Sequence, residues 1–356
     1  MPVAPDRPNQ HRDLPGSSAV ESSRVPVAGP IAVEPMQNAM FVEAAESAGA
    51  VVAPLSDDTR GLIWLSEKRA DELIDILATH PNIDWVQLPW AGVDGFRELF
   101  RVIDYDTAPV FTSAKGSYAE PVAEHALALT LAMQRELPSK ARAAEWQRER
   151  TGLSLYGNHV VIIGAGGITV ELLRLLAPFR VTTTVVRRSS APLDGATTTV
   201  PAAELHAVLP TADVVILAAA ATAETERLIG TAELALMPDH VVLVNIARGS
   251  LLDHDALVDA LRTDAIWGAA LDVTDPEPLP EAAADLEGRP EARNLVGIYA
   301  AITDATPTPI PPTILNSTTN QTLVENPVPI ALMKNSTAAS FITGQVIVAD
   351  GGVTIA

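Results

Sequence analysis

A glycine-rich string and a pair of arginines are the residues of this chain whose types and spacing are best suited to binding phosphate groups. The string GAGGIT, at Gly164–Thr169, follows an apolar run and precedes a helical pattern. Glycines in such a turn let the backbone approach a pyrophosphate, and the helix N-terminus presents unpaired amides to it. The predicted contacts are Gly164, Gly166, Gly167 and Ile168. A plain tight turn between a strand and a helix would give the same pattern.

The residues around this turn depart from the usual dinucleotide-binding fingerprint in two ways. Thr169 stands where the third glycine belongs, and we expect it to loosen the packing of the helix against its sheet. About twenty residues later, where a site selective for NAD carries an acidic residue, the chain reads VVRRSS. Arg187, Arg188 and Ser189 are suited to a 2′-phosphate. This predicts NADP(H) as the preferred cofactor and NAD(H) as the second; the alternative is a solvated basic loop.

Strand and helix patterns alternate on both sides of the glycine string, which predicts an α/β protein with parallel sheets. Before it, the strand-like runs VPVAGPIAV, AVVAPL, GLIWL and IDWVQLPW alternate with helical patterns at 38–48 and 68–80. From HVVIIG onwards, a helix at 170–179 is followed by the strand-like runs VTTTVV, ADVVILAAA, HVVLVNI and WGAALDV. Residues 121–147 read as one long connecting helix, with a kink at Pro138.

The composition of the chain limits the kinds of partner that it could bind and the compartments in which we expect it. The 356 residues suffice for two domains. A net charge of −20 argues against nucleic acid and anionic membrane surfaces, and no apolar run reaches the roughly 18 residues of a membrane span. The absence of cysteine removes disulfides and thiolate metal sites, so we expect a cytoplasmic protein without a metal site. Residues 1–25 are polar and Pro-rich, which predicts a disordered extension.

Five strings, in this order along the chain, resemble the D-isomer-specific 2-hydroxyacid dehydrogenase family: WVQLPWAGVD, AEPVAEHALALTLA, GAGGI, LVNIARGSLLD and ALDVTDPEPLP. The resemblance implies a flavodoxin-like α/β substrate domain at 26–120. A doubly wound Rossmann domain at 121–290, inserted into it, would bind NAD(P)(H). Residues 291–356 would be an atypical Pro/Thr-rich tail with a terminal strand. The implied activity is hydride transfer between NAD(P)H and a small 2-oxo acid, in a homodimer.

Matching each motif to this chain assigns expected roles. Arg248 would bind the substrate carboxylate and polarise its carbonyl, as a bidentate guanidinium can. The backbone amides of Gly92 and Val93 would bind the same carboxylate, and Glu277 would serve acid/base chemistry. The residues implied around the nicotinamide are Thr222, Asn245, Ala247 and Asp272. Alternatively, Arg248 is a surface arginine, and Glu277 is solvated charge in an acidic loop.

The family's catalytic histidine has no counterpart in this chain. In the family it follows the glutamate, in a strand-ending Thr-Pro-His, whereas the corresponding stretch here is NLVGIYAAITD, with Tyr299 and Ala300 near the expected place. All seven histidines precede that stretch: His11, His80, His125, His159, His206, His240 and His254. Loss of a positioned general acid costs about 10²–10⁴ in rate. We interpret His125 as a satisfied helix residue rather than a catalytic one, and His254 as the start of the next helix.

The end of the chain resembles a second family. ASFITGQVIVADGGVTIA is similar to the C-terminal strand of short-chain dehydrogenases/reductases, but no tyrosine of this chain has the lysine four residues later that their catalysis needs. Two hypotheses therefore stand beside the oxidoreductase. The chain is an NADP(H)-binding protein with little turnover, or it is a damaged or frame-shifted product. A Thr-Pro-His string in another reading frame downstream of Leu279 would favour the frame shift.

Overall fold

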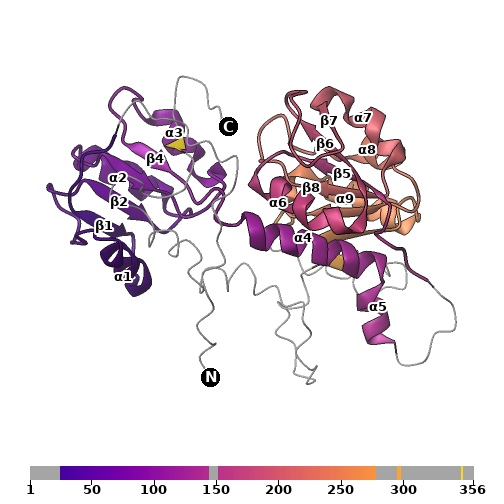
Figure 1. Ribbon diagram of the computed structural model, residues 1–356. Helices are drawn as coiled ribbons and strands as arrows, with labels where there is room; N and C mark the ends of the chain where they lie inside the picture. Colours follow the sequence, from indigo (N-terminus) through magenta and orange to yellow (C-terminus); the bar gives the residue numbers. More distant parts are fainter. Residues whose placement is uncertain (1–24, 144–150, 278–294, 298–345, 348–356) are drawn as a thin grey trace. The chain divides into compact units, whose positions relative to one another are not determined.

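A computed structural model describes residues 25–143, 151–277, 295–297 and 346–347 (Figure 1). The described residues form two compact units. The first holds the chain up to Tyr118 together with the short strand β12, and the second begins at Ala119 and includes β11. Because β12 returns to the sheet of the first unit, the second unit is inserted in the sequence of the first.

The first unit contains a mainly parallel sheet in the order β1-β2-β3-β4-β12. Its strands are β1 (Ile31–Glu34), β2 (Gly61–Trp64), β3 (Trp85–Gln87), β4 (Val110–Thr112) and the antiparallel β12 (Val346–Ile347). On the free side of β1, Val52 makes a parallel bridge to Ile31. When that segment is counted as the second strand, the order becomes 2-1-3-4-5, the flavodoxin-like order.

Helices of the first unit cover both faces of its sheet. α2 (Ala70–Thr79) and α3 (Arg97–Val102) pack on the face that buries Leu62 and Trp64, whereas α1 (Ala39–Ser47) packs on the face of Ile63. The side chain of Asn38 accepts a hydrogen bond from the Met40 amide at 3.1 Å, which explains why α1 begins there.

The second unit contains a parallel sheet in the order β11-β10-β9-β8-β5-β6-β7. The bounds are β5 (His159–Ile163), β6 (Thr182–Arg187), β7 (Thr198–Pro201), β8 (Val214–Leu217), β9 (Val242–Asn245), β10 (Gly268–Leu271) and β11 (Leu295–Gly297). Counted from β5, this is the Rossmann order 3-2-1-4-5-6 with one added edge strand. The order reverses between β5 and β8, and ligands of such sheets bind at the carboxyl ends of strands at that point.

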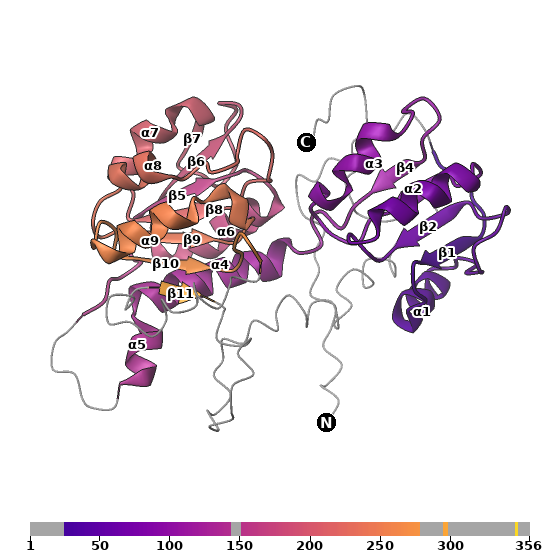
Figure 2. The same ribbon diagram turned by 180° about the vertical axis from the view of Figure 1, so that it is seen from behind.

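Two helical layers enclose this sheet (Figures 1 and 2). α4 (Ala119–Gln134) and α6 (Gly167–Leu176) pack on one face, with η2 (Ala177–Phe179) after α6. The other face carries α7 (Leu205–Val208), α8 (Thr231–Leu236) and α9 (His254–Arg262), with the short turns η3 (Ala202–Glu204) and η4 (Leu209–Thr211). Strand residues such as Ile162 are completely buried, and each such side chain stabilises the fold by about 1.5–3 kcal/mol.

The connecting helix is broken, so the prediction of one kinked helix is wrong. α4 ends at Gln134, and α5 (Leu137–Arg142) begins after Glu136, whose φ of 51° is left-handed. Pro138 lies in the first turn of α5 rather than at a kink. A proline is compatible with that position because the first amides of a helix have no intrahelical acceptor.

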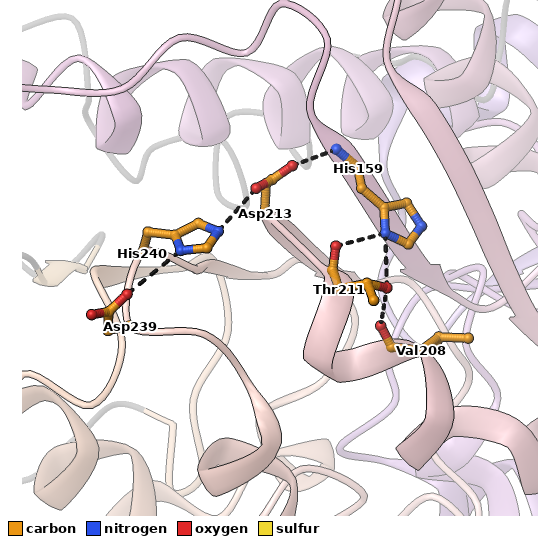
Figure 3. Close-up of polar contacts among 6 residues, drawn as sticks. All are labelled: His159, Val208, Thr211, Asp213, Asp239 and His240. Carbon is orange, nitrogen blue, oxygen red and sulfur yellow. Dashed lines mark hydrogen bonds and ion pairs between the residues drawn. The ribbon is translucent and has the colours of Figure 1, made fainter.

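A polar cluster joins the amino ends of three strands of the second sheet (Figure 3). The Asp213 carboxylate accepts from the His159 amide at 2.6 Å and from His240 Nε2 at 2.9 Å. His159 begins β5, Asp213 directly precedes β8, and His240 precedes β9. Since this is the edge opposite the carboxyl ends of the strands, we interpret the cluster as a structural clamp.

Most predicted elements occur with shorter bounds, and an α/β fold with parallel sheets is confirmed. The predicted extension at 1–25 lies, except for Val25, outside the described residues. So do Tyr299, Ala300 and most of the tail at 291–356, of which only β11 and β12 are described. Among the described residues, no helix is both long enough and apolar enough to cross a membrane.

Candidate dinucleotide site

The predicted glycine turn lies at the carboxyl end of β5, where the strand order reverses. Gly164 has a φ of +119°, and a Cβ there would lie 2.4 Å from the carbonyl oxygen of Ala218, which follows β8. Gly166 is the N-cap of α6, and a Cβ added to it would meet no atom within 4 Å. The turn therefore has open space directly in front of a helix N-terminus. Gly167 and Ile168, in the first turn of α6, supply amides that have no intrahelical acceptor.

Thr169 contributes to this turn in a way that the sequence did not indicate. Its side chain is completely buried, and its hydroxyl donates to the Gly164 carbonyl at 2.9 Å. The hydroxyl therefore ties the first turn of the helix to the glycine, and the expectation that Thr169 loosens the packing of α6 against its sheet stays a prediction. The open space at Gly166 and the fixed helix start together fit a bound pyrophosphate.

The basic pair lies at the end of β6, next to β5. Arg187 is the last residue of that strand, and its Nη1 donates to the Ala191 carbonyl at 3.5 Å. Arg188 and Ser189 are exposed. A hydrogen bond from the Thr222 side chain lowers the pKa of the Glu224 carboxyl, and the charge of Arg188 lowers it further. The loop after β8 thus places a carboxylate in the electrostatic field of this pair, a neighbour that the motif did not predict.

Thr222 belongs to that same loop, which is braced by Thr225. The Thr225 hydroxyl oxygen accepts from the Thr222 amide at 2.8 Å and donates to the Ala220 carbonyl at 2.8 Å. The Thr225 side chain therefore ties the loop together at Ala220 and Thr222, which fixes where Thr222 lies. No motif in the sequence marks Thr225 for this role.

Asn245, the last residue of β9, organises the loop that carries Arg248. Its buried side chain accepts from the Ala247 amide at 3.0 Å and donates to the Arg248 carbonyl at 2.9 Å. Arg248 is half-buried and extended, and its Nη1 donates to the Ala247 carbonyl at 2.8 Å. The Arg248 side chain therefore projects from a rigid turn, as an anion-binding group requires.

The Arg248 loop lies directly against the segment that follows β10. Gly249 begins the short turn η5 (Gly249–Leu251), and a Cβ added to it would lie 1.9 Å from the Thr274 carbonyl carbon. Thr274 is buried, and its hydroxyl donates to the Pro276 carbonyl at 3.0 Å. The structure thus brings the two predicted loops together, whereas Glu277 lies at the exposed end of the second one.

Asp272 follows β10 and is tied to the neighbouring strand. Its amide donates to the Asn245 carbonyl at 2.9 Å, and its carboxylate Oδ1 lies 3.4 Å from Nε2 of His125 on α4. That nitrogen is buried and makes no hydrogen bond, although it lies within ion-pair distance of the Asp272 carboxylate. The interpretation of His125 as a satisfied helix residue, rather than a catalytic one, stays a prediction. His254 begins α9, as predicted, behind the Asp253 cap.

The remaining predicted site residues belong to the first unit. Gly92 and Val93 follow β3 and precede the turn η1 (Asp94–Phe96), and both are half-buried. The Val93 carbonyl accepts from the Phe96 amide at 2.9 Å. Among the described residues of both units, no three His, Cys, Asp or Glu side chains are grouped so that they could hold a metal ion.

Comparison with known proteins identifies the family to which this chain belongs. Residues 125–291 match the model of the D-isomer specific 2-hydroxyacid dehydrogenase, NAD binding domain. An uncharacterised protein of Corynebacterium melassecola is 39% identical over 206 residues, covering 56% of this chain and 67% of that protein. A glyoxylate reductase of Thermococcus gammatolerans is 29% identical over 250 residues, covering 67% and 70%.

Two further matches are a longer protein and a solved structure that shares the fold. This chain spans 39% of the D-3-phosphoglycerate dehydrogenase of Archaeoglobus fulgidus, with 30% identity over 216 residues, or 57% of this chain. The crystal structure of a D-isomer specific 2-hydroxyacid dehydrogenase from Xanthobacter autotrophicus Py2, in complex with NADPH and MES, superposes with a TM-score of 0.64. That match covers 76% of this chain and 87% of the other at 22% identity, a likeness of fold.

Proposed function

Because the chain belongs to the D-isomer specific 2-hydroxyacid dehydrogenase family, we propose that it reduces a small 2-oxo acid with NADPH. The observation that carries this proposal is the turn at the β5/β8 reversal. There Gly164 closely approaches Ala218, and Gly166 leaves open space at the N-terminus of α6. A dinucleotide pyrophosphate fits that space, the backbone amides and the helix dipole.

The residues around the turn would hold the rest of the cofactor. Arg187, Arg188 and Ser189 are suited to a 2′-phosphate because guanidinium groups bind phosphate oxygens in pairs. Thr222, Asn245, Ala247 and Asp272 lie at or after the carboxyl ends of β8, β9 and β10 and would surround the nicotinamide. We propose a preference for NADP(H) over NAD(H).

Reduction of a 2-oxo acid adds a hydride to the carbonyl carbon and a proton to its oxygen. When bound, the cofactor supplies the hydride, and the protein supplies binding, orientation and the proton. Arg248, held by Asn245, would bind the carboxylate and polarise the carbonyl. Gly92 and Val93, in the substrate domain that we propose at 26–120, would bind the same carboxylate through their amides. Glu277 would supply the acid/base group.

Two measurements test this proposal. Titration of the protein with NADPH and NADH, followed by nucleotide fluorescence, should give a dissociation constant at least several-fold lower for NADPH. Equal constants would contradict the preference. Steady oxidation of NADPH in the presence of glyoxylate or hydroxypyruvate should accompany binding, and a protein that binds neither nucleotide would contradict the proposed function.

The second candidate function is an NADP(H)-binding protein with little turnover, whether a genuine variant or a frame-shifted product. It is favoured by the absence of any histidine after His254 in the sequence. Without a positioned general acid the rate would fall about 10²–10⁴-fold. Tight NADPH binding without measurable oxidation over a panel of 2-oxo acids would select this candidate.

We also propose a cytoplasmic homodimer. A protein without cysteine is compatible with a reducing compartment. Light scattering of the purified protein should give twice the mass of the 37.5 kDa chain, and a monomer mass would contradict the dimer.

A further inference from the structure

An imidazole and a carboxylate face each other where α4 crosses the ends of β9 and β10. Nε2 of His125 lies 3.4 Å from Oδ1 of Asp272, and the two side chains are only 20% and 19% exposed. Around His125, α4 buries apolar residues such as Ala123, Ala126 and Leu129. Burying the polar nitrogens of an imidazole among apolar side chains costs free energy unless a partner of suitable charge or hydrogen-bonding capacity lies beside them.

The backbone of Asp272 is fixed independently of this pair. Its amide donates to the Asn245 carbonyl at 2.9 Å, and the Asn245 side chain in turn holds the Arg248 loop. His125 therefore affects the orientation and the net charge of the Asp272 carboxylate, and it does not set the path of the backbone. That carboxylate belongs to the residues that would surround the nicotinamide.

We propose that His125 is a positioning residue, whose protonation neutralises Asp272 and thereby biases the site toward the reduced cofactor. The proposal rests on the proposed function, since it assumes that Asp272 meets the nicotinamide. An oxidised nicotinamide ring is positively charged and a reduced ring is neutral. An unpaired Asp272 carboxylate therefore favours the oxidised ring, and an imidazolium beside it removes that advantage.

Other charged groups lie on α4 itself and on α6. α6, which packs on α4, contributes Glu171 and Arg174, which pair with each other at 2.7 Å. α4 itself contributes Glu120, which is half-buried, and Glu124, which is exposed. β9 ends in the uncharged Asn245. Of these described charges, the Asp272 carboxylate lies 3.4 Å from the imidazole, within ion-pair distance.

Linkage fixes the direction of the effect. If protonation of His125 favours the reduced cofactor, binding of that cofactor must equally favour protonation. As the pH falls through the range of 5 to 8 where imidazoles titrate, the dissociation constant of NADP+ should rise relative to that of NADPH. We expect a change of about threefold to tenfold in this ratio, since coupling between sites is commonly about fivefold or more.

The test compares His125→Gln and Asp272→Asn with the wild-type full-length chain. NADPH binding is followed by fluorescence, and NADP+ binding by competition, from pH 5.5 to 8.5. Both variants should lose the pH dependence of the ratio. His206→Gln is the matched control, because His206 is an exposed histidine paired with Glu233 at 2.7 Å on the opposite face of the sheet, and it should keep the wild-type profile.

The outcomes separate this inference from the proposed function. Binding of both nucleotides with the same pH profile in wild type and in His125→Gln overturns the inference and leaves the function intact. A wild-type protein that binds neither nucleotide overturns both. If His125→Gln does not fold, Asp272→Asn still decides the question, because it keeps the side-chain shape and removes only the charge.

Discussion

At the scale of single residues, two charges at the adenosine end of the proposed site should have opposite effects on NADPH binding. Arg188 would offer positive charge to a 2′-phosphate, while Glu224 keeps a carboxylate in the field of this arginine. Arg188→Ala should therefore weaken NADPH binding about fivefold to tenfold and leave NADH unchanged, because an exposed ion pair contributes about 1 kcal/mol. Glu224→Gln should strengthen NADPH binding slightly. Nucleotide titration at low and high salt measures both effects.

The control for these two variants is Arg101→Ala, which removes an exposed arginine that pairs with Glu98 at 2.9 Å in the first unit. It should change neither dissociation constant. A parallel loss of NADPH and NADH affinity in Arg188→Ala would mean that the arginine does not read the 2′-phosphate.

Gly249 is the residue whose replacement should damage the site most directly. A Cβ there would lie 1.9 Å from the Thr274 backbone, which no rotamer can relieve, so the two loops must separate. We expect Gly249→Ala to lower the free energy of unfolding by about 1–3 kcal/mol and to weaken cofactor binding. Gly230→Ala is the comparison, since its nearest contact would be 3.6 Å. Equal unfolding midpoints in urea for both variants would argue against the close approach.

At the scale of elements, a carboxylate joins the starts of α7 and α8. Glu233 lies in the first turn of α8 and accepts from the Gly230 amide at 3.0 Å and from His206 of α7 at 2.7 Å. Burial alone would raise the pKa of Glu233, but these hydrogen bonds lower it below its ordinary value. A carboxyl with a lowered pKa in the folded state stabilises the fold above its unfolded pKa. That stabilisation is lost as the pH falls through the folded pKa.

Replacing this carboxyl should therefore matter at neutral pH and not in acid. Glu233→Gln should destabilise the protein by about 1 kcal/mol at pH 7. The difference from wild type should shrink below about pH 4, where carboxyls protonate. Urea unfolding at several pH values measures this, with the exposed Glu204→Gln as control. A constant difference across the pH range would show that the charge of Glu233 does not contribute.

The elements themselves follow closely from local patterns in the sequence. Apolar runs place β5, β8, β9 and β10, and Asn38 and Asp253 mark helix starts because their side chains accept from amides in the first turn. The break between α4 and α5 was not predictable, since no sequence pattern indicates that the backbone of Glu136 adopts the left-handed conformation. Nor was the role of Thr169, whose acceptor is a carbonyl set by the turn.

The candidate site was likewise predictable where it depends on local sequence, and not where it depends on contacts between distant segments. The motifs place Gly164, Asn245 and Arg248 at the carboxyl ends of strands because each lies at or just after the end of an apolar run: Gly164 follows β5, Asn245 ends β9 and Arg248 comes three residues later. The pair His125 and Asp272, and the contact of Gly249 with Thr274, depend on how segments distant in sequence pack. Periodicity carries no information on such pairs.

At the scale of the whole molecule, each unit has its own core. The first unit buries Trp64, Leu73 and Leu99, while the second buries separate sets of side chains on the two faces of its sheet. The proposed cofactor contacts all lie in the second unit, so binding should stabilise that unit by about 2.7 kcal/mol at a hundredfold excess over the dissociation constant. The first unit contributes no residue to those contacts.

Hydrogen exchange followed by mass spectrometry measures this prediction. With saturating NADPH, peptides that contain β5, β8 and β9 should exchange more slowly, because opening of their core then requires loss of the ligand. Peptides from β1 and β2 should keep their rates. A 2-oxo acid substrate added with the oxidised cofactor should slow exchange around Gly92 and Val93 as well, since their amides would then bind its carboxylate. Uniform slowing of both units by NADPH alone would mean that the units unfold together and that the cofactor acts on the chain as one cooperative body.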